Sequence, residues 1–223
     1  KVRLIGISSS TDRQTSAGFL KAGAHDFVSR PFVLEELQCR IASNVETLIR
    51  LKRLQELAAR DYLTNLFNRR HFFEHGPALV ETARQGGFPV SIALLDIDHF
   101  KQMNDRNGHD GEDQVLDAVA RNLSRLAERE TNLLARVGGE EFAILFAGAG
   151  LDEACRLAEE IRREIARQPL MLAGEEMTLT VSIGVTEISG AEKLGASLNR
   201  ADRALYAAKQ EGRNRVCSAV AEA

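Results

Sequence analysis

The stretch RVGGEEFAIL, residues 136–145, places two glycines and two acidic residues between apolar segments. Adjacent glycines between two apolar runs predict a β-hairpin that turns at Gly138 and Gly139. Glu140 and Glu141 would then lie at its tip, where crowded carboxylates repel one another and raise each other's pKa. Either these acids are solvated turn residues, or the hairpin presents them to a ligand that neutralises them.

A second acidic position ends the nearly continuous apolar run PVSIALLDID, residues 89–98. Such a run predicts a strand covered on both faces, and Asp96 at its carboxyl end lies where open α/β sheets bind ligands. Asp98 shares the face of Asp96 if the strand continues. Oxygen ligands without histidine or cysteine suit Mg²⁺, or Mn²⁺, and such an ion keeps positions for the phosphate oxygens of a nucleoside triphosphate.

The neighbouring segments predict an α/β fold with a mixed sheet, because helices alternate with strands but one connection is a hairpin. Amphipathic helices are expected over residues 111–127, 152–167 and 197–212, and a further strand over 177–188. These elements assign residues 61–223 to one main domain.

Residues 98–114 are predicted to form a loop that leaves the acidic strand end and offers free backbone N–H groups to phosphate. Within this loop, the amide of Asn104 and the carboxylate of Asp113 match the acceptor-and-donor edge of guanine. Lys209 and Arg213 lie four residues apart at the end of the last helix and supply cations suited to phosphate. Surface cations are usually only solvated, so this pair alone indicates little.

Two regions precede the main domain. Residues 1–32 contain two short strands with a helix between them, the pattern of a parallel crossover unit. Residues 33–60 contain neither glycine nor proline and predict a helix of roughly 40 Å. Its apolar residues fit a coiled-coil seam on which Asn44 would set the register; the alternative is a helix packed on its own domain. The apolar seam residues are Leu34, Leu37, Ile41, Leu48 and Leu51.

Composition limits the possible partners. The 223 residues carry a net charge of −3, so no broad basic surface is available for a nucleic-acid polymer. No apolar run approaches the ~20 residues of a membrane-spanning helix, so we expect no membrane partner. The scattered Cys39, Cys155 and Cys217 suggest free thiols in a reducing compartment. We therefore expect a cytoplasmic protein, and a fragment of a longer polypeptide because the chain begins with Lys1.

Five blocks in residues 61–216 together resemble the GGDEF family of diguanylate cyclases. They are DYLTNLFNRR (61–70), LLDIDHFKQMNDRNGHDGED (94–113), RVGGEEF (136–142), TVSIGV (180–185) and RADRALYAAKQEGRNRV (200–216). The third signature position of the family tolerates aspartate or glutamate, so residues 138–142 are an intact signature. The resemblance implies an enzyme that condenses two GTP molecules into cyclic di-GMP and releases pyrophosphate.

The resemblance also implies roles for single residues. Asp96, the carbonyl of Ile97 and Glu140 would hold the metal ions. Glu140 would also assist deprotonation of the ribose 3′-hydroxyl, and Glu141 would support the site. The implied nucleotide contacts are Asn104 and Asp113 on guanine, and Lys209, Arg213 and the backbone around His99 and Phe100 on the phosphates. Lys101 is a further implied substrate-binding residue. Gly138 and Gly139 would let the hairpin turn tightly and leave room for the nucleotide.

Each such domain would hold one GTP, whereas the product needs two reciprocal attacks. Two domains must therefore face each other about a two-fold axis, and the helix of residues 33–60 would pair them as a homodimer. Product inhibition in the family often uses an Arg-x-x-Asp site five residues before the glycines. Here Arg129 is present but Asn132 replaces the aspartate, so weakened product binding is expected.

Residues 1–32 resemble the last third of a response-regulator receiver domain. Ser8 or a neighbour would be the switch hydroxyl, and Arg30 replaces the usual lysine before Pro31. A planar guanidinium does not substitute freely for an ammonium, which argues against ordinary phosphoryl signalling. Two rival functions remain open: a non-enzymatic sensor of GTP or cyclic di-GMP, and a dimerisation module with a vestigial site.

Overall fold

The computed structural model describes residues 2–9, 13–127, 132–172, 174–190 and 192–220. The chain forms two compact units that divide between Ala58 and Ala59. The first unit consists of strand β1 (Ile5–Ser8), helix α1 (Arg13–Lys21), strand β2 (Asp26–Ser29) and helix α2 (Leu34–Ala59).

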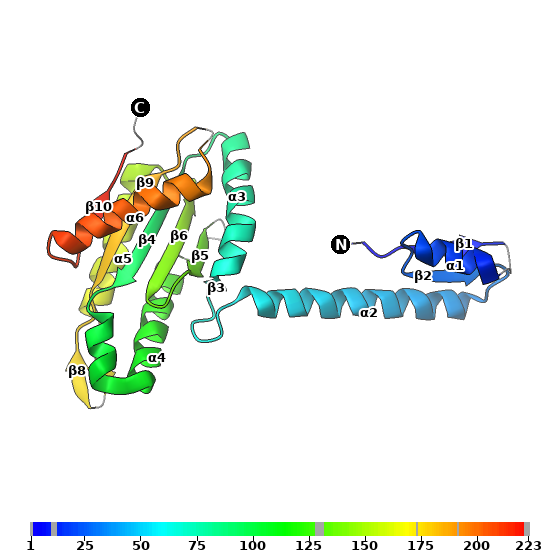
Figure 1. The fold of residues 1–223 in the computed structure, drawn as a ribbon, viewed down its shortest axis with the longest axis horizontal. Coiled ribbons are helices and arrows are strands. Elements are labelled where there is room, and N and C mark those ends of the chain that lie inside the picture. The colour runs from blue at the N-terminus through cyan, green and yellow to red at the C-terminus, as the bar shows by residue number, and fades with distance from the viewer. Residues whose placement is uncertain (1, 10–12, 128–131, 173, 191, 221–223) are drawn as a thin grey trace. The chain divides into compact units, whose positions relative to one another are not determined.

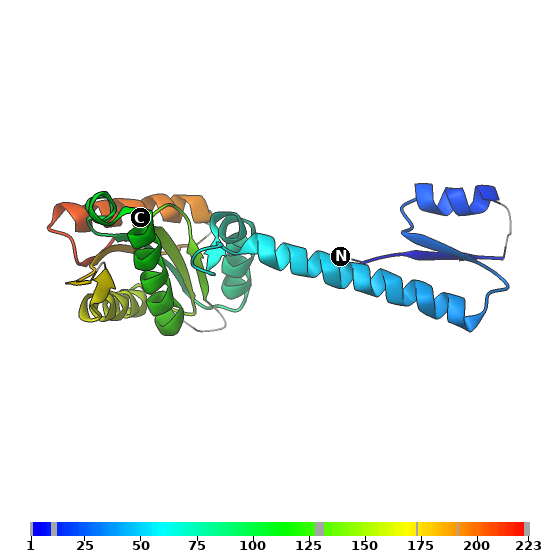
Figure 2. The ribbon, with the colours of Figure 1, turned by 90° about the horizontal axis from the view of Figure 1, so that it is seen from below.

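β1 and β2 pair in parallel, with Ile5 opposite Asp26, which confirms the predicted strand–helix–strand unit. Figure 2 shows α1 and α2 on opposite sides of this strand pair. The rings of Phe19 and Phe27 pack α1 onto β2 with their centroids 5.4 Å apart, and Val28 is buried.

Helix α2 is continuous, as the absence of glycine and proline predicts, but Asn44 does not face outward for a partner helix. Its Nδ2 donates to Asp26 Oδ2 at 3.3 Å, and Arg40 Nη1 lies 2.7 Å from Asp26 Oδ1. The first half of α2 therefore packs on its own unit, and the assignment of Asn44 to the seam is corrected. Ile41 and Val45, exposed by 46% and 47%, leave an apolar face on the helix.

The second unit is built on a six-stranded sheet with the strand order β10-β9-β4-β6-β5-β3. β4 is antiparallel to both its neighbours, whereas β10 is parallel to β9 and β3 is parallel to β5. This confirms the predicted mixed sheet. The strands are β3 (Phe67–Asn68), β4 (Val90–Ile97), β5 (Leu133–Arg136), β6 (Glu141–Ala147), β9 (Val181–Glu187) and β10 (Val216–Ser218).

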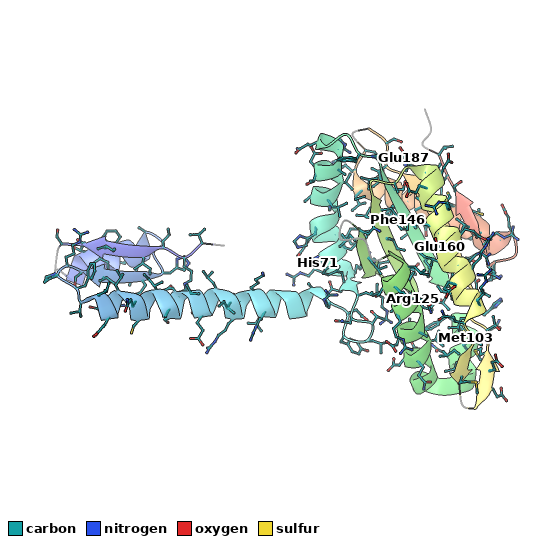
Figure 3. The ribbon with its side chains drawn as sticks, turned by 180° about the vertical axis from the view of Figure 1, so that it is seen from behind. His71, Met103, Arg125, Phe146, Glu160 and Glu187 are labelled. Atoms are coloured by element: carbon teal, nitrogen blue, oxygen red, sulfur yellow. The ribbon has the colours of Figure 1, made fainter. Side chains whose placement is uncertain are left out.

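Helices cover both faces of this sheet. Successive residues of β4 point to opposite faces, and both sets are mostly apolar and need to be buried. Ala93, Leu95 and Ile97 pack in the core formed with α4 and α5, and Ile92 packs in the core formed with α3 and α6. Figure 1 views the face covered by α3 and α6, and Figure 3 views the opposite face, on which Phe146 is labelled. The helices are α3 (Arg69–Gln85), α4 (Phe100–Ala127), α5 (Leu151–Arg167) and α6 (Leu194–Gln210).

The largest departure from the sequence expectation concerns residues 98–114. Helix α4 begins at Phe100, so the predicted loop is wrong beyond Asp98 and His99. Glycine within a helix costs only about 1 kcal/mol relative to alanine, and tertiary packing of the apolar face outweighs that penalty here. Gly111 lies inside the helix and is buried.

Two other elements are missed by the sequence pattern. Residues 69–85 form α3 although Pro77 lies within it; Asn68 begins this helix by accepting a hydrogen bond from His71 N. The expected strand 177–188 is interrupted, because Met177 belongs to a separate antiparallel hairpin of β7 (Leu170–Leu172) and β8 (Glu175–Met177).

The three cysteines are free thiols, as their spacing predicts. Across the described residues, no helix is both long enough and apolar enough to cross a membrane.

Candidate active site

Asp96 occupies the next-to-last position of β4, at the carboxyl end of the strand. It lies in register with Glu141 of β6 on one side and Ser182 of β9 on the other. Because alternate strand residues share a face, its side chain lies on the same face as Ile92, the face of α3 and α6. Asp96 is only 5% exposed, and burial raises the pKa of its carboxyl group. A nearby cation would favour its ionised form.

The last turn of α6 supplies that cation. Lys209 Nζ lies 2.7 Å from Asp96 Oδ2. The helix approaches β9 closely because Gly184 has no side chain; a Cβ there would collide with the backbone of Ala201 and Leu205. Close packing of α6 on β9 therefore places a predicted phosphate-binding lysine on a predicted metal-binding aspartate.

Glu140, in the connection between β5 and β6, lies within electrostatic range of Asp96. Burial raises the pKa of Glu140, and the negative charge of Asp96 raises it further, whereas Lys209 acts in the opposite direction. Two acids that are far apart in the sequence thus share one site, and the ammonium of Lys209 offsets part of their repulsion.

The β5–β6 connection is wider than the predicted two-residue turn. The backbone N–H groups of Val137 and Gly138 both donate to Glu141 O, at 2.9 and 3.3 Å, so residues 138–140 form the loop. Neither Gly138 nor Gly139 has a positive φ, so the turn does not require the left-handed freedom of glycine. Instead, a Cβ on Gly138 would collide with the Glu141 side chain, and Gly139 borders open space beside the acids.

This hairpin is stabilised by an ion pair. No local sequence pattern indicates that pair. Arg136 Nη1 lies 3.1 Å from Asp61 Oδ1, and Arg136 Nε and Nη2 donate to Gly139 O at 3.0 and 2.8 Å. Burial alone would raise the pKa of Asp61, but hydrogen bonds from Thr64 and Arg136 outweigh it and hold the pKa below its usual value. The segment DYLT is thereby fastened to the loop that carries Glu140.

Comparison with known proteins identifies the family of this chain. Residues 58–215 match the family described as the diguanylate cyclase GGDEF domain. The chain belongs to the GGDEF family. The response regulator PleD of Caulobacter vibrioides is 39% identical to it over 215 residues, which cover 92% of this chain and 47% of PleD. The chain therefore spans less than half the length of that relative.

Solved structures share the GGDEF fold. The coiled coil and GGDEF domain of DgcB from Caulobacter crescentus, in complex with c-di-GMP, is 36% identical, with a TM-score of 0.74 over 82% of this chain and 99% of that chain. The active GGEEF domain of a diguanylate cyclase from Vibrio cholerae is 35% identical, with a TM-score of 0.62 over 68% of this chain and 96% of that chain. These structures confirm the predicted α/β fold with a mixed central sheet.

In this GGDEF domain, Asp98 does not continue the strand beside Asp96. β4 ends at Ile97, and the Asp98 carboxylate turns toward β9, where it accepts hydrogen bonds from Thr180 Oγ1 at 2.8 Å and Ser182 Oγ at 2.7 Å. The Asp98 carboxylate is thus held by hydroxyl groups of residues 180 and 182, whereas the Asp96 carboxylate contacts Lys209.

The residues predicted to contact guanine lie on α4 and not on a loop. Asn104 is half-buried, and its Oδ1 is enclosed without a hydrogen-bond partner in the described part of the chain. An enclosed acceptor without a donor is costly, so a ligand N–H there would be stabilising. Asp113 is exposed on the same helix.

The predicted phosphate-binding residues come from two segments, the start of α4 and the end of α6. His99 adopts a positive φ of 60° in the turn before α4, Phe100 is buried, and Lys101 is exposed. Arg213 is exposed in the turn after α6. Its positive charge partly opposes the rise that burial causes in the pKa of Asp96.

The structure describes only one of the two residues predicted to form the product site. Arg129 lies outside the described residues. Asn132 Nδ2 donates to Ala127 O at 3.1 Å, so this side chain stabilises the carboxyl end of α4 by capping one of its free carbonyls.

The donor atoms fit a hard divalent cation. Asp96, Glu140 and the backbone carbonyl of Ile97 offer oxygen alone, and the raised pKa of both carboxyl groups means that a nearby cation would favour their ionised forms. Among the described residues, no three His, Cys, Asp or Glu side chains gather closely enough to hold a metal by themselves. Such an incomplete oxygen set suits Mg²⁺, which keeps water and substrate phosphate oxygens in its shell.

Proposed function

We propose that this chain is the catalytic part of a diguanylate cyclase, which condenses two GTP molecules into cyclic di-GMP and releases two pyrophosphates. The observation that carries the proposal is the meeting of Asp96, Glu140 and Lys209 at the carboxyl end of β4. Two carboxylates with raised pKa beside a cation form a site for a metal-bound triphosphate.

Each residue would have a distinct task in the reaction. The ribose 3′-hydroxyl of one GTP attacks the α-phosphorus of the other, a new P–O bond forms, and the bond to pyrophosphate breaks. Glu140 would accept the proton of the hydroxyl as general base. Lys209 and Arg213 would stabilise the charge that develops on the phosphates.

Asp96, Glu140 and the carbonyl of Ile97 would hold Mg²⁺ or Mn²⁺. When bound, such a cation supplies activation of the attacking hydroxyl and neutralisation of the leaving pyrophosphate. Glu141 would support the hairpin, because its side chain lies against Gly138.

Guanine would be selected by α4. The enclosed Oδ1 of Asn104 would accept a hydrogen bond from a guanine N–H, and Asp113 would accept another. Guanine offers two adjacent donor groups, N1–H and N2–H2, whereas adenine offers only its N6 amine. Adenine would therefore leave one of these two acceptors unpaired, which is costly where the acceptor is enclosed. The backbone of His99 and Phe100 would contact the phosphates, and Lys101 would be a further substrate contact.

The reaction requires two copies, because one domain holds one GTP and the attack is reciprocal. The exposed apolar face of α2 around Ile41 and Val45 supports pairing through this helix as a homodimer. The solved DgcB structure contains a coiled coil together with its GGDEF domain, which favours the same arrangement here.

A glutamate at the third signature position is compatible with turnover. The Vibrio cholerae domain, which is an active GGEEF domain, has the same signature type as residues 138–142. This likeness favours an enzyme over a non-enzymatic sensor or a vestigial dimerisation module.

Residues 1–32 would be the end of a receiver domain, so that the chain is the output part of a response regulator. The resemblance to PleD, a response regulator, supports this assignment. Ser8 at the end of β1 would be the switch hydroxyl, and Arg30 would replace the usual lysine. Feedback at Arg129 would be weak, because the uncharged Asn132 already donates to Ala127 O.

The test is turnover of GTP with Mg²⁺ by the purified chain at several protein concentrations, with cyclic di-GMP as the measured product. We expect product formation to rise more steeply than linearly with protein concentration until dimers are saturated. Binding of GTP without any product would indicate a sensor, and failure to bind GTP would indicate a vestigial site.

A further inference from the structure

We propose that Asp98 is a positioning residue for Arg213, and that it acts by holding the turn after α6 against the carboxyl end of β4. The inference rests on the proposed cyclase function, because that function assigns the Arg213 guanidinium to the triphosphate.

The contacts of Asp98 exclude a role as a further metal ligand. Asp98 is 4% exposed. Its Oδ1 accepts from Ser182 Oγ at 2.7 Å, and its Oδ2 accepts from Thr180 Oγ1 at 2.8 Å and from Asn214 N at 3.0 Å. Its own N–H donates to Thr180 O at 2.9 Å. A carboxylate that already accepts three hydrogen bonds in a buried position has little lone-pair capacity left for a cation.

The turn that Asp98 holds has an unusual backbone. Gly212, Arg213 and Asn214 have φ values of 112°, 61° and 46°. Left-handed conformations are unfavourable for most residues with a Cβ, although asparagine tolerates them, so Arg213 keeps its conformation only if the surroundings impose it. Arg213 N donates to Ala208 O at 3.0 Å and Asn214 N donates to Asp98. Arg213 is therefore fixed between a helix-end hydrogen bond and the buried carboxylate.

Further contacts fix the turn on its other side. Asn214 Oδ1 accepts from Arg162 Nη1 at 2.6 Å, and Ile183 N donates to Arg215 O at 2.9 Å. These contacts involve α5 and β9, whereas the contact with Asp98 links the turn to the residue that follows β4. Asp98 therefore sets the position of the turn relative to Asp96.

Asp96 and Asp98 thus each position a different cationic residue. Asp96 contacts the ammonium of Lys209 on the last turn of α6. Asp98 contacts the backbone immediately after Arg213. Removing the Asp98 carboxylate would let Arg213 relax from its left-handed conformation and carry its guanidinium away from the phosphates.

A double-mutant cycle tests this inference by binding, without turnover. The probe is a GTP analogue with a methylene bridge between the α- and β-phosphates, and its Kd is measured for wild type, Asp98→Ala, Arg213→Ala and the double variant. We expect each single change to weaken binding by about tenfold, the loss of a charge-assisted contact. The double variant should bind within about twofold of Arg213→Ala, because both changes remove one interaction. Multiplying losses, or wild-type binding by Asp98→Ala, would overturn the inference.

Three variants separate positioning from general damage. Asp98→Asn keeps one oxygen that can accept the Asn214 N–H, and we expect its Kd to stay within about threefold of wild type. If Asp98→Ala does not fold, the exposed turn offers a second pair. Asn214→Pro removes the N–H that Asp98 accepts and cannot adopt the φ of 46°, so it should weaken binding like Arg213→Ala. Asn214→Gly keeps the N–H and suits the positive φ. Wild-type affinity of Asn214→Pro would refute the role of this contact.

The outcome is separable from that of the proposed function. Wild-type protein that binds the analogue but never forms cyclic di-GMP would end the cyclase proposal and leave the binding cycle interpretable. Normal cyclisation with multiplying losses in the cycle would end the role of Asp98 and leave the cyclase proposal standing.

Discussion

The ammonium of Lys209 lies 2.7 Å from Oδ2 of Asp96, so a predicted phosphate ligand and a predicted metal ligand contact each other in the free protein. The contact joins the last turn of α6 to the end of β4 across the α3–α6 face of the sheet. A cation and a triphosphate that bind together would take over both partners, because the metal replaces the ammonium at the carboxylate and the phosphates receive the ammonium.

Lys209→Met therefore has two opposite effects. Turnover should fall by at least about tenfold, since a charge-assisted contact to phosphate is lost. The affinity of the nucleotide-free protein for Mn²⁺ at pH 8 should rise, because no ammonium competes for Asp96. Removal of the cation also raises the pKa of Asp96, so metal binding should be lost at a higher pH than in wild type. Manganese titration by electron paramagnetic resonance measures both, and Lys193→Met, at the other end of α6, is the matched control. Unchanged metal affinity would contradict the competition.

Glu140→Gln should abolish cyclisation without lowering the Tm of the metal-free protein. Burial and Asp96 raise the pKa of Glu140 in the folded state above its unfolded value, so its ionised form costs stability at pH above the folded pKa. That cost disappears as the pH falls through the raised pKa and below the unfolded value. Any gain in Tm should therefore be present at pH 7.5 and absent near pH 4. Glu175→Gln, on an exposed strand, is the control, and residual turnover by Glu140→Gln would rule out its role as base.

Asp61→Asn tests the brace between the DYLT segment and the signature hairpin. The Asp61 and Arg136 side chains are only 17% and 12% exposed, so loss of the charge should cost about 2 kcal/mol of unfolding free energy. Turnover should fall further than stability alone explains, because Arg136 also holds Gly139 O. Urea unfolding and the cyclisation assay measure the two effects. Glu74→Gln removes an exposed ion pair with Arg70 and should change stability far less than Asp61→Asn, because solvent screens exposed pairs; equal effects of the two variants would argue against a brace.

Gly184→Ala should displace α6 and with it Lys209. The new Cβ would collide with the backbone of Ala201 and Leu205, which cannot rotate away as a side chain can. We expect a loss of about 2–3 kcal/mol in stability and a larger relative loss of turnover. The control is Gly195→Ala, which lies on α6 itself and whose added Cβ would meet no neighbouring element within 4 Å. It should be neutral or stabilising by up to about 1 kcal/mol. Thermal unfolding of both variants decides the matter, and a stable, active Gly184→Ala would disprove the close approach.

Ile41→Asp tests pairing through α2. A charge in the centre of the exposed apolar face should shift the chain toward monomers and lower turnover at micromolar concentration by about tenfold or more. Sedimentation velocity and the concentration dependence of turnover provide the measurements. Ser43→Asp adds the same charge at another exposed position of the helix and should leave association unchanged. A dimer that survives Ile41→Asp would require another pairing surface.

Much of the fold follows from local patterns. The apolar run ending at Asp96 predicts β4, and the paired glycines predict the β5–β6 hairpin, because both signals depend on residues that are neighbours in the sequence. The start of α4 and the whole of α3 are less predictable. Glycine and proline lower helix propensity locally, but burial of Phe72, Val80 and Phe100 against the sheet outweighs that penalty.

By itself, the sequence determined which acids and cations this protein carries, where its main strands lie along the chain and the family to which it belongs, because these depend on residue identity and short-range periodicity. The tertiary structure decided which of them meet. Lys209 on Asp96, Arg136 on Asp61, Asn214 on Asp98 and Asn44 on Asp26 are each pairs of residues distant in the chain. Such contacts depend on strand register and on how closely helices pack on the sheet, and no local pattern encodes either.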